Sequence, residues 1–206
     1  DKIGADGREY IRFAVDGATR MQGLIRDLLK FSQVGSKGLE LAPVDCDAVA
    51  QIALSNLSVA IEESDARVEF EALPTVMADP GQLAQLFQNL IGNALKFRNP
   101  EEPMSIHVGC TSPTSEIKPG SAIEIVVRDT GIGIAPADHD RIFAIFQRLH
   151  TRSEFAGTGV GLSICRKIVE RHGGKIWVES VEGNGTAFHF TLTAGADEKA
   201  EEEPAR

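Results

Sequence analysis

The pattern of residues 79–97 predicts a helix with one broad apolar face. Asp79 is a residue type that caps helices, and Pro80 suits the first helical position because its missing N–H would have no partner there. Apolar residues then recur at the three- and four-residue spacing of a helix face, namely Leu83, Leu86, Phe87, Leu90, Ile91, Ala94 and Leu95. A stripe of this width is typical of a helix that packs on a larger apolar surface.

Elsewhere, helical and strand patterns alternate irregularly. The sequence predicts helices over residues 45–63, with Asp45 as the N-cap, and over 140–146 and 160–171. It predicts strands over 67–72, 104–111, 122–128, 175–180 and 186–193, of which the last two flank a turn at 182–185. Because strands follow one another directly at the end, we expect an α+β fold, a two-layer sandwich whose mixed sheet carries helices on one face.

The N-terminal residues 8–33 carry a different pattern. Apolar residues three and four apart form the seam of a bundle helix, and they are Ile11, Ala14, Ala18, Met21, Ile25 and Leu28. Gly35, Gly38 and Pro43 then break the pattern, which predicts a linker near residues 34–44. We therefore expect three parts: a bundle helix at 1–36, a globular domain at 37–194 and an acidic, disordered tail at 195–206.

Composition narrows the class of protein. Of the 206 residues, 42% are hydrophobic and 25% charged, as in an average globular domain. The net charge of −9 and the scattered Lys and Arg residues predict no nucleic-acid partner. Cys46, Cys110 and Cys165 show no metal-binding spacing, which favours a reducing, cytoplasmic location.

Features of the chain's ends and hydropathy complete this picture. No apolar run approaches the ~20 residues that span a bilayer, so we predict no membrane contact for this chain. The chain begins with Asp1 in polar sequence, and we expect it to be a fragment of a longer protein.

Amide side chains line one face of the predicted helix at 82–97. Asn89 and Asn93 lie four residues apart, with Gln85 one turn earlier and Lys96 nearby. An amide oxygen suits Mg²⁺ when phosphates already supply the anionic ligands, and a lysine can meet a phosphate as a point charge. An amphipathic helix with solvated amides gives the same pattern, so this helix alone leaves both readings open.

Asp129 is predicted at the end of an apolar strand, directly before Gly131 and Gly133. A carboxylate in this place can accept a hydrogen bond from an exocyclic amine such as that of adenine, and the glycines let backbone approach a ring closely. Asp and Gly also favour ordinary turns, so the segment alone fits a simple cap and turn equally well.

A second glycine-rich segment, residues 157–161, precedes the predicted helix at 160–171. Free N–H groups and the positive end of the helix dipole are therefore available to phosphate oxygens. No Lys-Ser or Lys-Thr pair follows, which excludes a Walker A loop. The preceding residues 148–156 are polar and aperiodic rather than a strand, which excludes a dinucleotide-binding fingerprint and favours a flexible lid. The turn at 183–186 is accounted for by hairpin geometry.

Together these segments resemble, in order and spacing, the sequence boxes of the sensor histidine kinase catalytic domain. QLFQNLIGNALKF matches the N box, DTGIGIAP the first glycine box, RIFAIFQRL the F box, GTGVGLSICRKIVERHGG the second glycine box and GNGTAFHFTL the third. The resemblance covers residues 75–193, and NALKFRNPEEP and FQRLHTRSEFAGTGVGLSI look most like the phytochrome-like, soluble-sensor branch. It implies the ATP-binding sandwich shared with gyrase-like and chaperone ATPases.

The resemblance implies that ATP and Mg²⁺ bind between the asparagine helix and a lid at about residues 147–160, anchored by Phe143 and Phe146. The catalytic residues that the resemblance implies are Asn93 as the Mg²⁺ ligand, Asn89 in support of it, Lys96 at a phosphate, and Gln85. The nucleotide-binding residues implied are Asp129 at the adenine amine, Phe97, Gly131 and Gly133 around the base, Gly157, Thr158, Gly159, Val160, Gly161 and Leu162 at the phosphates, and Thr186 in support of the adenine contact.

Residues 8–33 resemble the second helix of the family's dimerisation and phosphoacceptor domain, whose acceptor histidine lies on the first helix. The five histidines are His107, His139, His150, His172 and His189, all inside the catalytic-domain match, and we interpret each as a surface or strand histidine. The resemblance thus implies a homodimer through the N-terminal helix in the full-length protein and a response-regulator receiver domain as partner. We do not expect this chain to phosphorylate itself.

Two other classes of function remain as alternatives. One is an ATPase of the same fold that drives conformational change, as in type II topoisomerases and large chaperones, which lack the F box and the upstream dimerisation helix. The other is a nucleotide-binding or dimerisation module without catalysis, against which the presence of Asn93, Asp129 and all glycine segments argues. The sequence favours the kinase.

Overall fold

A computed structural model describes residues 4–36, 38–112, 114–151, 155 and 157–196, so residues 197–206 of the expected tail lie outside it. Its helices are α1 (Ala5–Ser36), α2 (Cys46–Ser64), α3 (Pro80–Lys96) and α4 (Gly161–Arg171). Its strands are β1 (Ala42–Asp45), β2 (Arg67–Phe70), β3 (Thr75–Ala78), β4 (Ser105–Cys110), β5 (Ala122–Asp129), β6 (Ile176–Ser180) and β7 (Thr186–Thr193).

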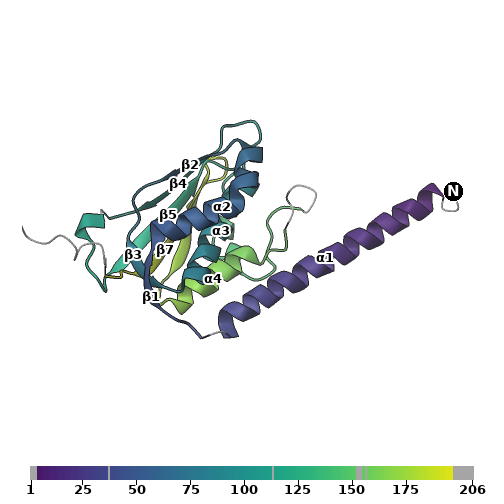
Figure 1. The fold of residues 1–206 in the computed structure, drawn as a ribbon. Helices are drawn as coiled ribbons and strands as arrows, with labels where there is room; N and C mark the ends of the chain where they lie inside the picture. The colour runs from purple at the N-terminus through teal and green to yellow at the C-terminus, as the bar shows by residue number, and fades with distance from the viewer. Residues whose placement is uncertain (1–3, 37, 113, 152–154, 156, 197–206) are drawn as a thin grey trace, which may run out of the picture.

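The main sheet has five strands in the order β2-β4-β5-β7-β6. β2 and β4 run parallel, while the other neighbours are antiparallel. α3 and α4 cover one face of this sheet and α2 packs beside α3 (Figure 1). The expected α+β sandwich, with a mixed sheet and helices on one face, is confirmed.

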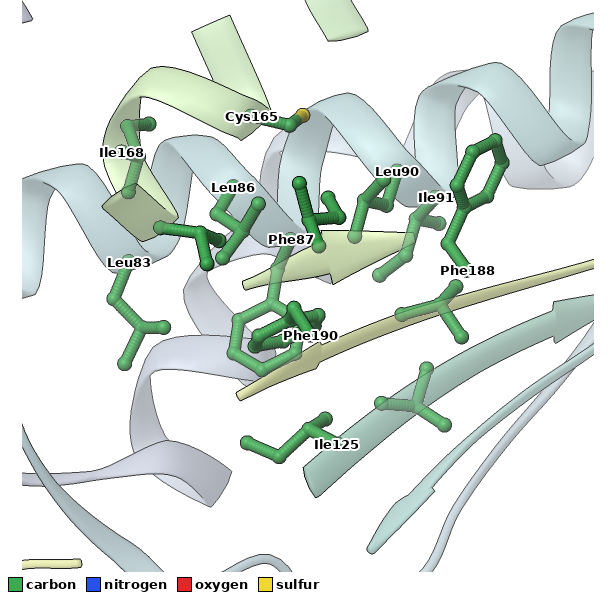
Figure 2. Close-up of a cluster of buried hydrophobic side chains, with 14 of the residues drawn as sticks. Leu83, Leu86, Phe87, Leu90, Ile91, Ile125, Cys165, Ile168, Phe188 and Phe190 are labelled. Carbon is green, nitrogen blue, oxygen red and sulfur yellow. The ribbon is translucent and has the colours of Figure 1, made fainter. Parts of the chain in front are cut away.

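The core lies between α3, α4 and the sheet (Figure 2). The apolar stripe of α3 faces inward as its spacing predicts, and Phe87 meets Phe190 of β7 edge to face at a centroid distance of 6.0 Å. α4 adds Cys165 and Ile168, and β5 adds Ile125. Each such side chain stabilises the fold by roughly 1.5–3 kcal/mol on full burial, so α3 is fixed firmly on the sheet.

A buried histidine joins the start of α3 to the end of α4. The Asp79 carboxylate caps α3 by accepting the Gln82 N–H at 2.9 Å. The Asp79 N–H donates to Nε2 of His172 at 3.0 Å, and Nδ1 of the same ring donates to the Ile168 carbonyl at 2.8 Å. α3 carries the amide face and α4 begins in the second glycine segment. The hydrogen bonds of His172 therefore hold these two helices in a fixed relative position.

α1 ends at Ser36 and β1 begins at Ala42, so the break between them falls within the region near 34–44 where the sequence predicts a linker, and β1 pairs with β3 in a separate two-stranded sheet. One helix prediction was wrong. The helix expected over 140–146 is only a 3-10 turn, Arg141–Phe143. Phe143 inserts into the core against Phe188 at 6.3 Å, and the chain then extends at Ala144, so an α-helix cannot continue.

α1 is a single long helix that leaves the globular part (Figure 1). Its last turns pack on α4, where Lys167 Nζ donates to the Phe31 carbonyl at 3.0 Å and lies 4.0 Å from the centre of the Phe31 ring. Val34 is buried there. The large apolar side chains exposed on α1 are Tyr10, Ile11, Phe13, Val15, Met21, Leu24, Ile25, Leu28 and Leu29. Within the described residues, no helix combines the length and hydropathy needed to cross a membrane.

Candidate functional site

A cavity of about 360 Å³ opens between α3, α4, the end of β5 and residues 147–150, 155 and 157–161. It collects side chains and backbone from parts of the chain that are far apart in sequence. Most of the residues that the sequence predicts for the site line this cavity, namely Gln85, Asn89, Asn93, Lys96, Phe97, Asp129, Gly133, Gly157, Thr158, Gly159, Gly161, Leu162 and Thr186. The structure thus brings together the asparagine helix and all three glycine segments.

Gly131 and Val160 are the expected site residues that do not line the cavity. The Gly131 N–H instead donates to the Asp129 carboxylate at 2.8 Å, behind the cavity wall. Val160 is fully buried, and its carbonyl accepts the Ser163 hydroxyl at 2.7 Å and the Ile164 N–H at 3.0 Å at the start of α4. Both residues support groups that face the cavity.

Asp129 is the last residue of β5, and its side chain is buried at the cavity wall. Burial raises the pKa of this carboxyl to about 6, although backbone N–H groups of Gly131 and Thr186 lower it in part by hydrogen bonding to the carboxylate. Thr186 lies directly opposite on β7. Two backbone hydrogen bonds therefore fix the carboxyl group in place at the wall of the cavity.

Close backbone packing holds the loop after Asp129 against the β6–β7 turn. Gly133 has a φ of +72°, and a Cβ there would lie 2.2 Å from the Val181 carbonyl oxygen. A Cβ at Gly185, whose φ is +78°, would lie 2.1 Å from the Asp129 carbonyl oxygen. Any larger residue at either place would push the two segments apart. Hairpin geometry was therefore an incomplete account of the third glycine segment, which also forms part of the site's wall.

Ser180 is a site residue that sequence reasoning missed. Its hydroxyl accepts the Ile134 N–H at 2.8 Å and donates to the Gly185 carbonyl at 2.7 Å, so it fastens the first glycine segment to the third. The Thr186 hydroxyl lies 3.2 Å from it. A serine within an alternating strand carries no distinctive sequence signal, and only the pairing of the segments reveals its role.

The amide face of α3 points into the cavity rather than into bulk solvent. Gln85, Asn89 and Asn93 line it together with Gln88, which the sequence did not single out. The Asn89 side-chain nitrogen donates to the Gly161 carbonyl at 3.3 Å, so this residue also ties α3 to the start of α4. The cavity wall therefore offers several neutral amide groups beside a helix N-terminus.

Lys96 and a group of aromatic rings lie at the end of α3. The ammonium of Lys96 is 4.3 Å from the centre of the Phe97 ring, and burial, with a smaller contribution from Arg148, lowers the pKa of this amine. Phe97 contacts Phe155 at 5.0 Å and His150 at 5.9 Å between ring centres. His150, interpreted from sequence as a bland surface or strand histidine, lines the cavity instead.

α1 contributes part of the cavity wall, which the sequence did not predict. Asp27 and Lys30 both line the cavity. The Thr158 hydroxyl donates to the Asp27 carboxylate at 2.5 Å, across 131 positions of sequence. Such a contact has no local signature, because it depends on how α1 docks on α4.

Comparison with known proteins places this geometry in a family. Residues 78–196, more than half of the chain, match the family described as "Histidine kinase-, DNA gyrase B-, and HSP90-like ATPase". The chain belongs to this family. It is 48% identical to cyanobacterial phytochrome A of a Nostoc species over 97% of this chain and 25% of that protein. It is 33% identical to the adaptive-response sensory kinase SasA of a Synechococcus species over 90% of this chain and 48% of that protein.

A solved structure described as full-length ShkA in complex with AMPPNP shares the fold. The TM-score is 0.71 and the sequence identity 29%, over 95% of this chain and 41% of that one. The expected resemblance to sensor histidine kinases, including phytochrome-like ones, is confirmed. The chain spans about a quarter of the phytochrome and about half of SasA, so the family match concerns one portion of longer proteins.

Proposed function

We propose that this chain is the ATP-binding catalytic portion of a sensor histidine kinase, which transfers the γ-phosphoryl group of ATP to a histidine of the dimerisation domain. The observation that carries this proposal is the single cavity that joins the amide face of α3, Asp129 and the glycine segments. The related ShkA protein was solved in complex with AMPPNP, an analogue of ATP, which supports ATP as the ligand.

The two ends of the cavity suit the two ends of a nucleotide. At the β5 end, Asp129 would accept the adenine amine, with Gly133, Phe97 and Thr186 around the base. At the other end, the N-terminus of α4 and the backbone of 157–161 would face the phosphates, since free N–H groups and the helix dipole favour anions. Lys96 and Arg148 add positive charge near the same segment.

The amide side chains fit Mg²⁺ as a partner of the nucleotide. Asn93 would supply a neutral oxygen ligand, with Asn89 and Gln85 nearby, while the phosphates and water supply the rest of an octahedral shell. When bound, Mg²⁺ would neutralise charge on the transferring phosphoryl group. The residues of the chain would bind and orient ATP in a site that excludes water, with Lys96 as an additional charge at the phosphates.

The remaining parts of the proposal concern the longer protein. The exposed apolar face of α1 supports dimerisation through residues 1–36, next to a catalytic domain at 37–194 and a tail at 195–206. The phosphoryl group would pass from the acceptor histidine to an aspartate of a response-regulator receiver domain. A cytoplasmic location suits a reaction that consumes ATP and receives signals from other domains.

The test supplies a separate polypeptide carrying an acceptor-histidine helix of the same family, together with radiolabelled ATP and Mg²⁺. We expect acid-labile label on the acceptor histidine and none on this chain. Asn93→Ala should abolish transfer, whereas Asp16→Ala, an exposed change on α1, should leave it intact. ATP hydrolysis without label on the histidine would contradict the kinase proposal and favour an ATPase, and absence of nucleotide binding would overturn both.

A further inference from the structure

One face of α1 packs against the globular domain. Gly23, Asp27, Phe31 and Val34 follow each other at four-, four- and three-residue spacing and are partly or fully buried, whereas the residues between them are exposed. Met21, Leu24, Ile25 and Leu28 are exposed. The partly or fully buried positions run along α1 from α4 to the cavity, which Asp27 lines.

Two contacts of different kinds lie along this buried face. Phe31 and Val34 pack on α4, where Lys167 binds the Phe31 carbonyl and covers its ring. One turn further toward the N-terminus, the Thr158 side chain docks on α1. Its hydroxyl donates to Asp27, and its methyl carbon lies 4.0 Å from where a Cβ at Gly23 would be. Thr158 thus makes a polar contact with the helix at Asp27, and its methyl group faces Gly23.

Thr158 belongs to the segment that faces the nucleotide phosphates in the proposed function. The preceding residue, Gly157, lies over Lys96, whose Nζ would be 2.7 Å from a Cβ at that glycine. Gly159 is packed on the Gln147 carbonyl, and a Cβ there would lie 2.7 Å from its oxygen. The Asp27–Thr158 hydrogen bond therefore fixes the middle of a segment whose flanks lie against Lys96 and the Gln147 carbonyl.

We propose that Asp27 is a positioning residue that ties the phosphate-facing glycine segment to the bundle helix, so that the position of α1 sets how long ATP is held. The inference rests on the proposed function, because it assumes that the cavity takes ATP. Movement of α1 away from α4 breaks the Asp27–Thr158 bond, and the segment then opens and releases the nucleotide faster. Asp27 acts through Thr158 and need not touch ATP.

The experiment measures the dissociation rate of a fluorescent ATP analogue by stopped-flow displacement with excess ATP. The variants are Asp27→Ala, Thr158→Val, the double variant and Thr158→Ser, which retains the hydroxyl. Asp16→Ala is the matched control, since it removes an acidic side chain from an exposed position of the same helix. Loss of a hydrogen bond to a charged group predicts that Thr158→Val and Asp27→Ala each release the analogue about tenfold faster.

The double variant separates positioning from simple charge removal. If the two residues act as one pair, it releases the analogue no faster than either single variant, and Thr158→Ser stays close to wild type. Effects that multiply in the double variant would mean that Asp27 acts through its charge alone and would overturn the proposal. Dissociation rates within twofold of wild type, or slower release, would overturn it as well. A wild-type chain that binds no analogue would refute the proposed function instead.

Discussion

The buried Asp129 carboxyl makes nucleotide binding depend on pH. A hydrogen bond from the adenine amine requires the ionised carboxylate as acceptor, and burial places the pKa of this group at about 6. At pH 7.5 the group is ionised, and we expect Asp129→Asn to weaken ATP binding by about 1.5–3 kcal/mol, the scale of a hydrogen bond to a charged group. At pH 5 only about one carboxyl in ten is ionised, so the wild type itself loses about 1.4 kcal/mol, or tenfold in affinity.

Isothermal titration calorimetry between pH 5 and pH 8 provides the measurement. The phosphates of ATP also titrate near pH 6, so the wild-type curve alone cannot isolate the carboxyl group. The ratio of the wild-type to the Asp129→Asn affinity removes that contribution, because both proteins meet the same ligand. This ratio should fall about tenfold between pH 7.5 and pH 5. A ratio that stays constant over this range would refute the adenine contact of Asp129.

Four other outcomes follow from the same geometry. Because folding raises the pKa of Asp129 from 3.8 to about 6, its stabilising contribution is present below pH ~4 and is lost as the pH rises through 6. In urea titrations without nucleotide, the wild type should therefore lose up to about 3 kcal/mol relative to Asp129→Asn between pH 4 and pH 7.5, and a constant difference would contradict this. Gly131→Ala should destabilise the fold by roughly 1–3 kcal/mol, since its Cβ would lie 2.6 Å from the Phe97 carbonyl oxygen. A Cβ at Gly161 meets nothing within 4 Å, so Gly161→Ala should unfold like wild type but weaken ATP binding; equal stabilities of the two glycine variants would refute the distinction. Asn93→Ala should remove the Mg²⁺-dependent part of the ATP affinity, and wild-type sensitivity to chelation of Mg²⁺ in this variant would argue against a metal ligand there.

Local signals predicted most of the fold. The cap at Asp79 and the apolar spacing of α3 place the helix within one residue of its observed start and end, because capping and periodicity act over a few positions. β1 and β3 escaped prediction, since each has four residues and depends on a partner some thirty positions away. The helix expected at 140–146 failed because Phe143 is held by the core rather than by helical neighbours.

Site residues could be predicted from the sequence where the residue type itself indicates a chemical role. Asn93 and Asp129 stand out because amide and carboxylate oxygens bind specific partners, a metal ion or a hydrogen-bond donor, and both residues line the cavity. Gly131 shows the limit of that reasoning, since its small size serves the approach to the Phe97 carbonyl and not the cavity. Asp27 could not be assigned, because a helix of the expected bundle reaches the cavity only through tertiary docking.

The length of α1 gives its docking a mechanical consequence. At 1.5 Å per residue, Ala5 lies about 44 Å along the helix from Val34, whereas Asp27 lies about 10 Å from it. If the helix pivots at its buried end, it acts as a lever with a ratio of about four. A sideways displacement of about 4 Å at the distal end then shifts Asp27 by about 1 Å, enough to lengthen a hydrogen bond beyond its useful range. Small displacements at the Asp27–Thr158 contact would thus result from larger displacements, driven by weaker forces, at the distal end of α1.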